Sequence, residues 1–313
     1  MFRIGSSLYQ AGVVHAAAYA SASSKGPDTI LPLIHELSID AIEGSWAEGD
    51  EAARSILSWS GCDIVYVAGG LMRSRSIDPS ATDPDARSAM LAAMRKIVDA
   101  ANWYDARLLL ISAGPDVAVH ERAGAIAALG ATLRELCRYA EQTRPQDPLW
   151  VTFENFDREL DQKRLLGPTV ETAALIADIR RDHGNIGMTL DMSHVAQLGE
   201  DFAQAVATAG ELVVHAHVAN CGLDAAMPRA FGDSHCRFGM PGGRLGADDV
   251  VTFLGALDAA GYGRRTVPTK APLISVEMKT ADGETPELVL VNGLRMLLQS
   301  AARTDILTTR NLA

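Results

Sequence analysis

The chain has 313 residues, of which 48% are hydrophobic and 21% charged, and a formal net charge of −11. This composition is typical of a folded globular protein and excludes a disordered chain. The excess of 39 acidic over 28 basic residues argues against nucleic acid as a partner, because nucleic-acid surfaces neutralise phosphates with Lys and Arg.

The N-terminal segment predicts a strand at Arg3–Leu8, followed by small apolar residues up to position 24. That stretch resembles a secretion signal, but Gln10 and His15 interrupt it and Arg3 alone supplies positive charge ahead of it. No part of the chain reaches the ~20 uninterrupted apolar residues that a membrane span needs. We therefore expect a cytoplasmic protein with no membrane partner.

Short apolar runs then alternate with segments of helical period along the rest of the chain. Seven more strands are predicted near Asp40–Ser45, Asp63–Ala68, Arg107–Ser112, Leu149–Asn155, Gly187–Met192, Leu212–Val218 and Leu273–Met278. Helices are predicted over Arg87–Trp103, Ala125–Ala140, Val170–Ile179, Ala247–Ala260 and Glu287–Ala302. Eight strands alternating with helices predict an α/β protein, a (β/α)8 TIM barrel forming one domain over residues 1–313. The long connection 219–246 has no regular pattern, and connections of that length are usually functional.

The last four predicted strands each end in a group that can bind a metal. The active site of such a barrel lies at the C-terminal ends of its strands. Three carboxylates gathered there would repel each other and be costly to desolvate without a cation between them. A single Glu or His at a strand end usually lies on the solvated rim or packs in the core. Four such residues on adjacent strands indicate a site for one divalent ion. An oxygen-rich set suits Mn²⁺, Mg²⁺ or Co²⁺, and Zn²⁺ is also compatible. The candidate ligands are Glu154, Asp191, His217 and Glu277.

Other polar residues are expected around this centre. Because side chains alternate faces along a strand, Thr152, His215 and Ser275 should point into the barrel one layer below the ligands. Glu43 ends the second strand and could face either the pocket or the solvated rim. Trp46, just beyond it, could in the same way form an apolar wall of the pocket or lie on the rim.

Four short motifs resemble the xylose isomerase-like barrel superfamily, and the resemblance spans nearly the whole chain. Members of that superfamily include sugar phosphate isomerases and epimerases, ketose 3-epimerases, inosose dehydratases and endonuclease IV. The motifs are Glu154-Asn155-Phe156-Asp157-Arg158, Asp191-x-x-His194, His215-x-His217 and Val276-Glu277.

The resemblance to the epimerase branch implies a function for the candidate ligands. It implies that the four hold one metal ion, and that Glu154 and Glu277 act as acid and base on opposite faces of a ketose. The expected enzyme is a metal-dependent sugar isomerase or epimerase that acts on a ketose or related polyol through a metal-bound enediolate. His194 would bind a substrate hydroxyl, or pack at the start of a helix.

The connection 219–246 supports an alternative reaction on the same scaffold. Asp233, His235 and Arg237 would bind substrate hydroxyls or supply an additional acid and base. Elimination needs an acid near the leaving group, so a lyase or dehydratase acting on a keto-sugar, of the inosose or 3-keto-glycoside type, is the second hypothesis. Lys279 falls beyond the predicted eighth strand and is left outside the predicted site.

Two further hypotheses are weaker. The Asp233-x-His235 pair is similar to metal ligands of endonuclease IV, but that nuclease also needs histidines on earlier strands. Strands three and four end here in Gly69-Gly70 and Ser112-Ala113-Gly114. The other hypothesis is a barrel that binds a sugar without converting it, but such a protein would not need all four candidate metal ligands.

Other cofactors are not indicated. No nucleotide-binding glycine loop occurs, and four scattered cysteines do not form a disulfide framework or thiolate zinc site. The expected partner is a small sugar or polyol, with a homo-oligomer as one option for the assembly. The identity of the sugar is left open.

Overall fold

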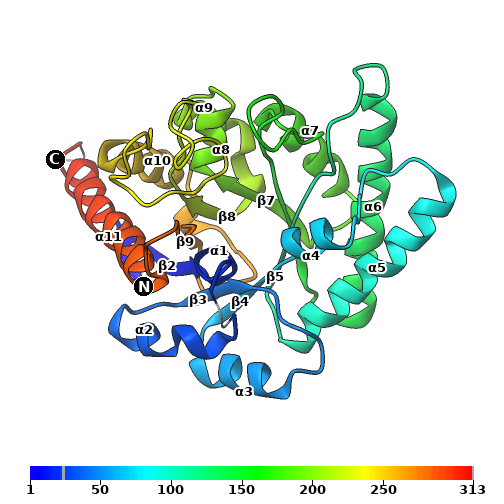
Figure 1. Cartoon of the computed structure of the whole chain (residues 1–313), viewed down its shortest axis with the longest axis horizontal. Coiled ribbons are helices and arrows are strands. Elements are labelled where there is room, and N and C mark those ends of the chain that lie inside the picture. The colour runs from blue at the N-terminus through cyan, green and yellow to red at the C-terminus, as the bar shows by residue number, and fades with distance from the viewer. Residues whose placement is uncertain (23–24, 312–313) are drawn as a thin grey trace.

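The computed structural model describes residues 1–22 and 25–311, and within them eight parallel strands form a closed barrel (Figure 1). Each strand pairs with its neighbour in chain order, and β9 pairs with β2 to close the ring. The predicted (β/α)8 fold is therefore confirmed. The barrel strands are β2 (Ser7–Val14), β3 (Ala41–Gly44), β4 (Asp63–Val67), β5 (Leu108–Ser112), β6 (Trp150–Glu154), β7 (Ile186–Asp191), β8 (Val213–Val218) and β9 (Leu273–Val276).

The prediction of the first strand at Arg3–Leu8 was wrong. A short strand β1 (Phe2–Ile4) turns back at Gly5, whose φ is +57°, and pairs antiparallel with the start of β2. The barrel strand is β2, inside the segment that resembled a secretion signal. Gln10 can be buried within β2 because its side-chain amide is hydrogen-bonded. It donates to Asp63 Oδ2 at 2.9 Å and accepts from the backbone amide of Ala271 at 3.2 Å.

Helices surround the barrel and shield its strands from solvent (Figure 1). The five predicted helices are present with ends that differ from the predicted ones, most of all the last helix, which continues to Asn311 and not to Ala302. Helix α5 begins as expected for a proline in its first turn, with the Asp83 side chain accepting from the Ala86 amide. The main helices are α3 (Glu51–Ser60), α5 (Pro84–Trp103), α6 (Arg122–Thr143), α7 (Thr169–Ile179), α9 (Phe202–Ala209), α10 (Ala247–Ala259) and α11 (Pro286–Asn311).

Shorter helical segments lie in the connections at both ends of the barrel. They are α1 (His15–Ala18), η1 (Pro27–Ile30), α2 (Leu31–Glu36), α4 (Gly69–Ser74), α8 (Met192–Gln197), η2 (Gly210–Leu212) and η3 (Tyr262–Arg264). The connection 219–246 between β8 and α10 contains no regular helix or strand, as predicted. It is held to the segment after β9 by the Lys279 amide, which donates to the His235 carbonyl at 2.9 Å.

Two expectations about the whole chain can be compared with the structure. All four cysteines are unpaired, and burial raises the pKa of the Cys137 thiol. Throughout the described ranges, every helix is too short or too polar to cross a membrane.

Candidate metal centre

The four predicted ligands come from four consecutive strands and meet at the C-terminal end of the barrel. Glu154 and Asp191 are the last residues of β6 and β7. His217 lies next to the end of β8 and is in register with Asp191. Glu277 follows β9, and its amide donates to the Val218 carbonyl at 3.1 Å. Parallel pairing without a large offset therefore brings residues from four strands together.

Their ligand atoms all lie within 4.8 Å of one another. The Nδ1 atom of His217 is 2.9 Å from Glu277 Oε2, 3.2 Å from Glu154 Oε1 and 3.6 Å from Asp191 Oδ2. Glu154, Asp191 and His217 are buried, and Glu277 is half-buried. Three carboxylates and one imidazole nitrogen thus point at one small volume.

The electrostatics of this cluster favour a cation. Burial alone would lower the pKa of His217, but the charges of Glu43 and Glu277 raise it well above its ordinary value. Burial and the nearby Glu277 raise the pKa of Glu154. Asp191 Oδ2 is buried and has no hydrogen-bond partner among the described residues, whereas its Oδ1 accepts from the Ser193 amide at 2.5 Å. The residues present therefore fit a divalent ion, which would supply the charge and occupy the unpaired oxygen.

A buried carboxylate beneath the centre orients His217. The carboxylate belongs to Glu43, whose Oε2 is 3.2 Å from His217 Nε2. The Nδ1 atom of His217 is therefore the nitrogen that faces the candidate ligands. Glu43 Oε1 is 2.9 Å from His215 Nε2, and His215 Nδ1 is 3.0 Å from the Thr189 hydroxyl. That hydroxyl is 2.7 Å from the Thr152 hydroxyl, which continues a polar layer inside the barrel.

This layer settles two expectations. Thr152, His215 and Ser275 lie buried below the ligands, as the alternation of side chains predicted. Glu43 faces the barrel interior and not the rim. Burial would raise its pKa, but the two histidines hold it well below the ordinary value, so Glu43 is a carboxylate. The sequence could have indicated this role through its place at the end of the second strand.

Replacing Glu43 by Gln is expected to weaken metal binding about 10–100-fold, the usual effect of losing a carboxylate behind a ligating histidine. An amide has one acceptor oxygen where the carboxylate has two, so it cannot accept from both His215 and His217 and fixes the Nε2–H tautomer of His217 less firmly. Calorimetric titration of metal into chelator-treated protein would measure the change. Glu48→Gln is the matched control, because Glu48 is an exposed glutamate on the connection that follows β3. Equal affinities for wild type and Glu43→Gln would contradict the orienting role.

His194 is completely buried beside the candidate ligands. Its ring packs against Phe156, with centroids 4.1 Å apart, and its Nε2 lies 3.7 Å from both Glu154 Oε1 and Asp233 Oδ1. No hydrogen bond reaches that Nε2 from the described residues. His194 therefore packs at the start of α8 and turns its Nε2 toward the centre, while binding of a substrate hydroxyl stays a prediction.

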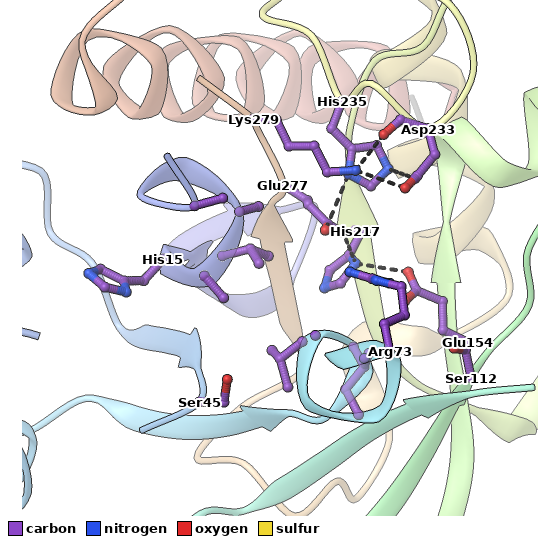
Figure 2. A pocket seen from close by; sticks show the side chains of 18 of the residues that line it. His15, Ser45, Arg73, Ser112, Glu154, His217, Asp233, His235, Glu277 and Lys279 are labelled. Atoms are coloured by element: carbon purple, nitrogen blue, oxygen red, sulfur yellow. Dashed lines mark hydrogen bonds and ion pairs between the residues drawn. The ribbon is translucent and has the colours of Figure 1, made fainter. Parts of the chain in front are cut away.

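Asp233, His235 and Lys279 form a charged cluster at the edge of the centre (Figure 2). Asp233 Oδ1 is 2.9 Å from His235 Nε2, and Asp233 Oδ2 accepts from Lys279 Nζ at 2.8 Å. His235 Nδ1 is 3.2 Å from Glu277 Oε1. Burial would lower the pKa of His235, but Glu277 and Asp233 raise it well above its ordinary value. Lys279 thus belongs to the site, contrary to the prediction, because the chain after β9 turns back over Asp233.

Arg237 and Trp46 are not brought to this centre. The Nε of Arg237 donates to Glu284 Oε1 at 2.6 Å, outside the set of residues around the metal ligands. Trp46 packs against His15 and Tyr104 and borders a different cavity. Their positions in the sequence were close to the site, but the backbone directs both side chains elsewhere.

The centre opens into a cavity of about 310 Å³, a size typical of small-molecule sites. Figure 2 shows Glu154, His217, Glu277, Asp233, His235 and Lys279 along one side of it. Arg73 from α4 and Ser112 from the end of β5 line it as well. The cavity therefore combines a candidate metal site with charged groups able to bind or protonate a polar ligand.

Comparisons with known proteins agree with this architecture. The family model described as "Xylose isomerase-like TIM barrel" matches residues 31–300. No curated protein sequence matches significantly. Among solved structures, a D-tagatose 3-epimerase-like protein has a TM-score of 0.70 at 17% identity, with 97% of this chain and 100% of that chain covered.

Two other similar structures illustrate the range of the fold. The structure named IOLI protein with a binding zinc atom has a TM-score of 0.70 at 12% identity, covering 95% of this chain and 99% of that chain. A 3-keto-D-glucoside 4-epimerase from E. coli has a TM-score of 0.62 at 16% identity, again covering 95% and 99%. At these identities the likeness shows the shared fold.

Proposed function

The chain belongs to the xylose isomerase-like TIM barrel family, and on that premise we propose that it is a metal-dependent sugar isomerase or epimerase. The substrate would be a ketose or a related polyol. One observation carries the proposal: Glu154 and Glu277 reach the same cavity beside two further candidate metal ligands, Asp191 and His217. Solved structures of similar fold include enzymes named as ketose 3-epimerases, which agrees with this reaction class.

The ion would be held by Glu154, Asp191, His217 and Glu277. When bound, a divalent cation polarises a carbonyl and an adjacent hydroxyl and so acidifies the C–H bond between them. Mn²⁺, Mg²⁺ and Co²⁺ match the oxygen-rich donor set, and Zn²⁺ matches the imidazole. The metal and the cytoplasmic location both stay predictions from the sequence.

The two glutamates would move the proton. They approach the cavity from β6 and from the end of β9, with β7 and β8 between them. A carboxylate on one side can remove a proton from carbon, while the carboxyl group on the other side returns one. Burial and the mutual charge favour a proton on one of the two, which is the arrangement that acid–base exchange requires. His194 would hold a substrate hydroxyl through its free Nε2.

The cluster of Asp233, His235 and Lys279 favours a second candidate, a lyase or dehydratase acting on a keto-sugar. Both reactions begin with removal of a proton next to a carbonyl. They differ afterwards, because elimination also needs a proton delivered to the departing oxygen. His235, held between Asp233 and Glu277, could supply that proton.

Replacing Asp233 by Asn should distinguish the two candidates. For the epimerase we expect unchanged product and proton exchange with KM raised about tenfold, since a charged hydrogen bond to substrate is lost. For the lyase, exchange should persist while release of the leaving group stops. NMR of the reaction in deuterated water follows both events. Asp224→Asn, on the exposed part of the same connection, is the matched control.

The proposed function itself is tested by product analysis. Metal-loaded protein would be incubated with ketohexoses and with 3-keto-glucosides, and the products separated by chromatography. We expect a reversible conversion that inverts one carbon or moves one carbonyl. Absence of any conversion, together with metal-dependent incision of abasic DNA, would overturn the proposal in favour of a nuclease.

A further inference from the structure

A second cavity adjoins the candidate metal centre and is lined by two arginines. Its volume is about 340 Å³, and it shares Gly69, Arg73 and Ser112 with the cavity of the metal centre. Ser112 on β5 is in register with Glu154 on β6, so the two cavities meet beside a candidate ligand. Arg73 reaches into the shared region from α4 (Figure 2), and Arg164 comes from the connection after β6.

Neither guanidinium has an ionic partner among the described residues, where no carboxylate oxygen lies within 4.0 Å of Arg73 or Arg164. The Nε of Arg164 is buried without a hydrogen-bond partner in the described part of the chain, and its Nη2 donates a long hydrogen bond of 3.4 Å to the Gln162 side chain. Burial, followed by the charge of Arg73, lowers the pKa of Arg164. The two cations therefore repel each other, and part of one is desolvated without compensation.

The nearby carboxylates are committed elsewhere. Asp157 accepts from the amides of Leu160, Asp161 and Gln162, each at 2.8 Å. Asp233 is paired with Lys279 and His235. Asp78 lines the cavity itself, and its Oδ1 accepts from the Ser80 amide at 2.8 Å. One carboxylate against two guanidiniums leaves a positive surplus, in a chain whose net charge is −11.

We propose that this arginine cavity, defined by Arg73 and Arg164, binds a carboxylate or phosphate group at the end of the substrate remote from the metal. The inference rests on the proposed function and adds a substrate class: an acidic keto-sugar in place of a neutral ketose. Guanidinium groups suit either oxyanion because their planar donors form paired hydrogen bonds. The shared lining lets one molecule place its carbonyl at the metal centre and its anionic end between the arginines.

The test compares three probes that differ at carbon 6: D-fructose, D-fructose 6-phosphate and D-fructuronate. Their equilibrium binding to metal-loaded protein would be measured by calorimetry at low ionic strength. At least one anionic probe should bind at least about tenfold more tightly than D-fructose, as expected for charged hydrogen bonds. The phosphate and carboxylate arms identify which oxyanion the cavity prefers.

Arg73→Gln and Arg164→Gln should each abolish that preference. Arg75→Gln should retain it, since this exposed arginine near the end of the same helix borders a different cavity and its loss changes the net charge equally. Arg73 is exposed, so its variant tests the inference even if Arg164→Gln unfolds more easily.

Equal binding of the three probes, no binding of the anionic ones, or a preference that survives in Arg73→Gln would overturn the inference. Because the anion preference is read from relative affinities and not from conversion, its failure is distinguishable from failure of the proposed function. Absence of any sugar conversion would count against the reaction, while an arginine-dependent preference would still support the anion site.

Discussion

Glutamine in place of Glu154 or Glu277 is expected to lower sugar turnover by about 10³-fold or more. General acid–base catalysis alone contributes about 10²–10⁴-fold, and each residue is also a candidate metal ligand. An amide cannot accept the substrate proton, and it leaves less negative charge to hold a cation. The two effects fall on the same step, so each single variant should be nearly inactive.

Metal content separates the two contributions. Elemental analysis of each variant shows whether the ion is lost, and kcat at saturating metal reports the proton transfer that is left. Glu211→Gln is the matched control, because Glu211 is exposed before the start of β8, at the opposite end of the barrel. Full metal content and full activity in Glu277→Gln would show that this residue has neither role.

Removal of the metal is expected to abolish activity and lower the melting temperature by several degrees. A ligand present at 1,000 times its Kd stabilises the folded state by about 4 kcal/mol. The ion would link residues of four consecutive strands, so its loss should destabilise that whole side of the barrel. Elemental analysis should find about one divalent ion per chain before chelation, and re-addition should restore both properties. Identical melting curves with and without chelator would contradict a tightly held ion.

The affinity for the metal ion should fall as the pH is lowered. The carboxylates hold the pKa of His217 well above its ordinary value, so the metal-free imidazole keeps its second proton to higher pH than an ordinary histidine. That proton must leave Nδ1 before the atom can bind a cation. Affinity should therefore fall as pH falls, and calorimetry in buffers of different ionisation enthalpy should detect proton release. An affinity independent of pH between 5 and 8 would contradict this protonation state.

The convergence of the candidate ligands could be predicted because it depends on strand ends alone. In a parallel barrel the final residues of consecutive strands meet at one rim, so Glu154, Asp191 and His217 follow from strand boundaries correct to within a residue or two. Glu277 lies just past the observed end of β9, and the Val218 carbonyl holds its backbone in line.

Features that depend on tertiary contacts were not predictable in the same way. Glu43 becomes part of the site through two histidines more than 170 positions away. Lys279 joins it because the connection 219–246 lies against the chain after β9. The first strand was misplaced for two reasons. The turn at Gly5 interrupts the predicted strand, and the polar Gln10 within β2 is buried through a hydrogen bond to Asp63 that the local sequence does not indicate. Local pattern placed Glu43 at a strand end but left its direction open, and it did not reveal the contacts of Lys279 or the turn at Gly5.

The central claim is that one glutamate removes a proton from a carbon next to a carbonyl and the other returns one. The most direct measurement is NMR of a converted keto-sugar in deuterated water, with the kinetic isotope effect of substrate deuterated at that carbon. We predict deuterium at that one position, a primary isotope effect, and loss of exchange in Glu154→Gln and Glu277→Gln. Conversion that shows neither solvent deuterium nor an isotope effect at that carbon would contradict the account.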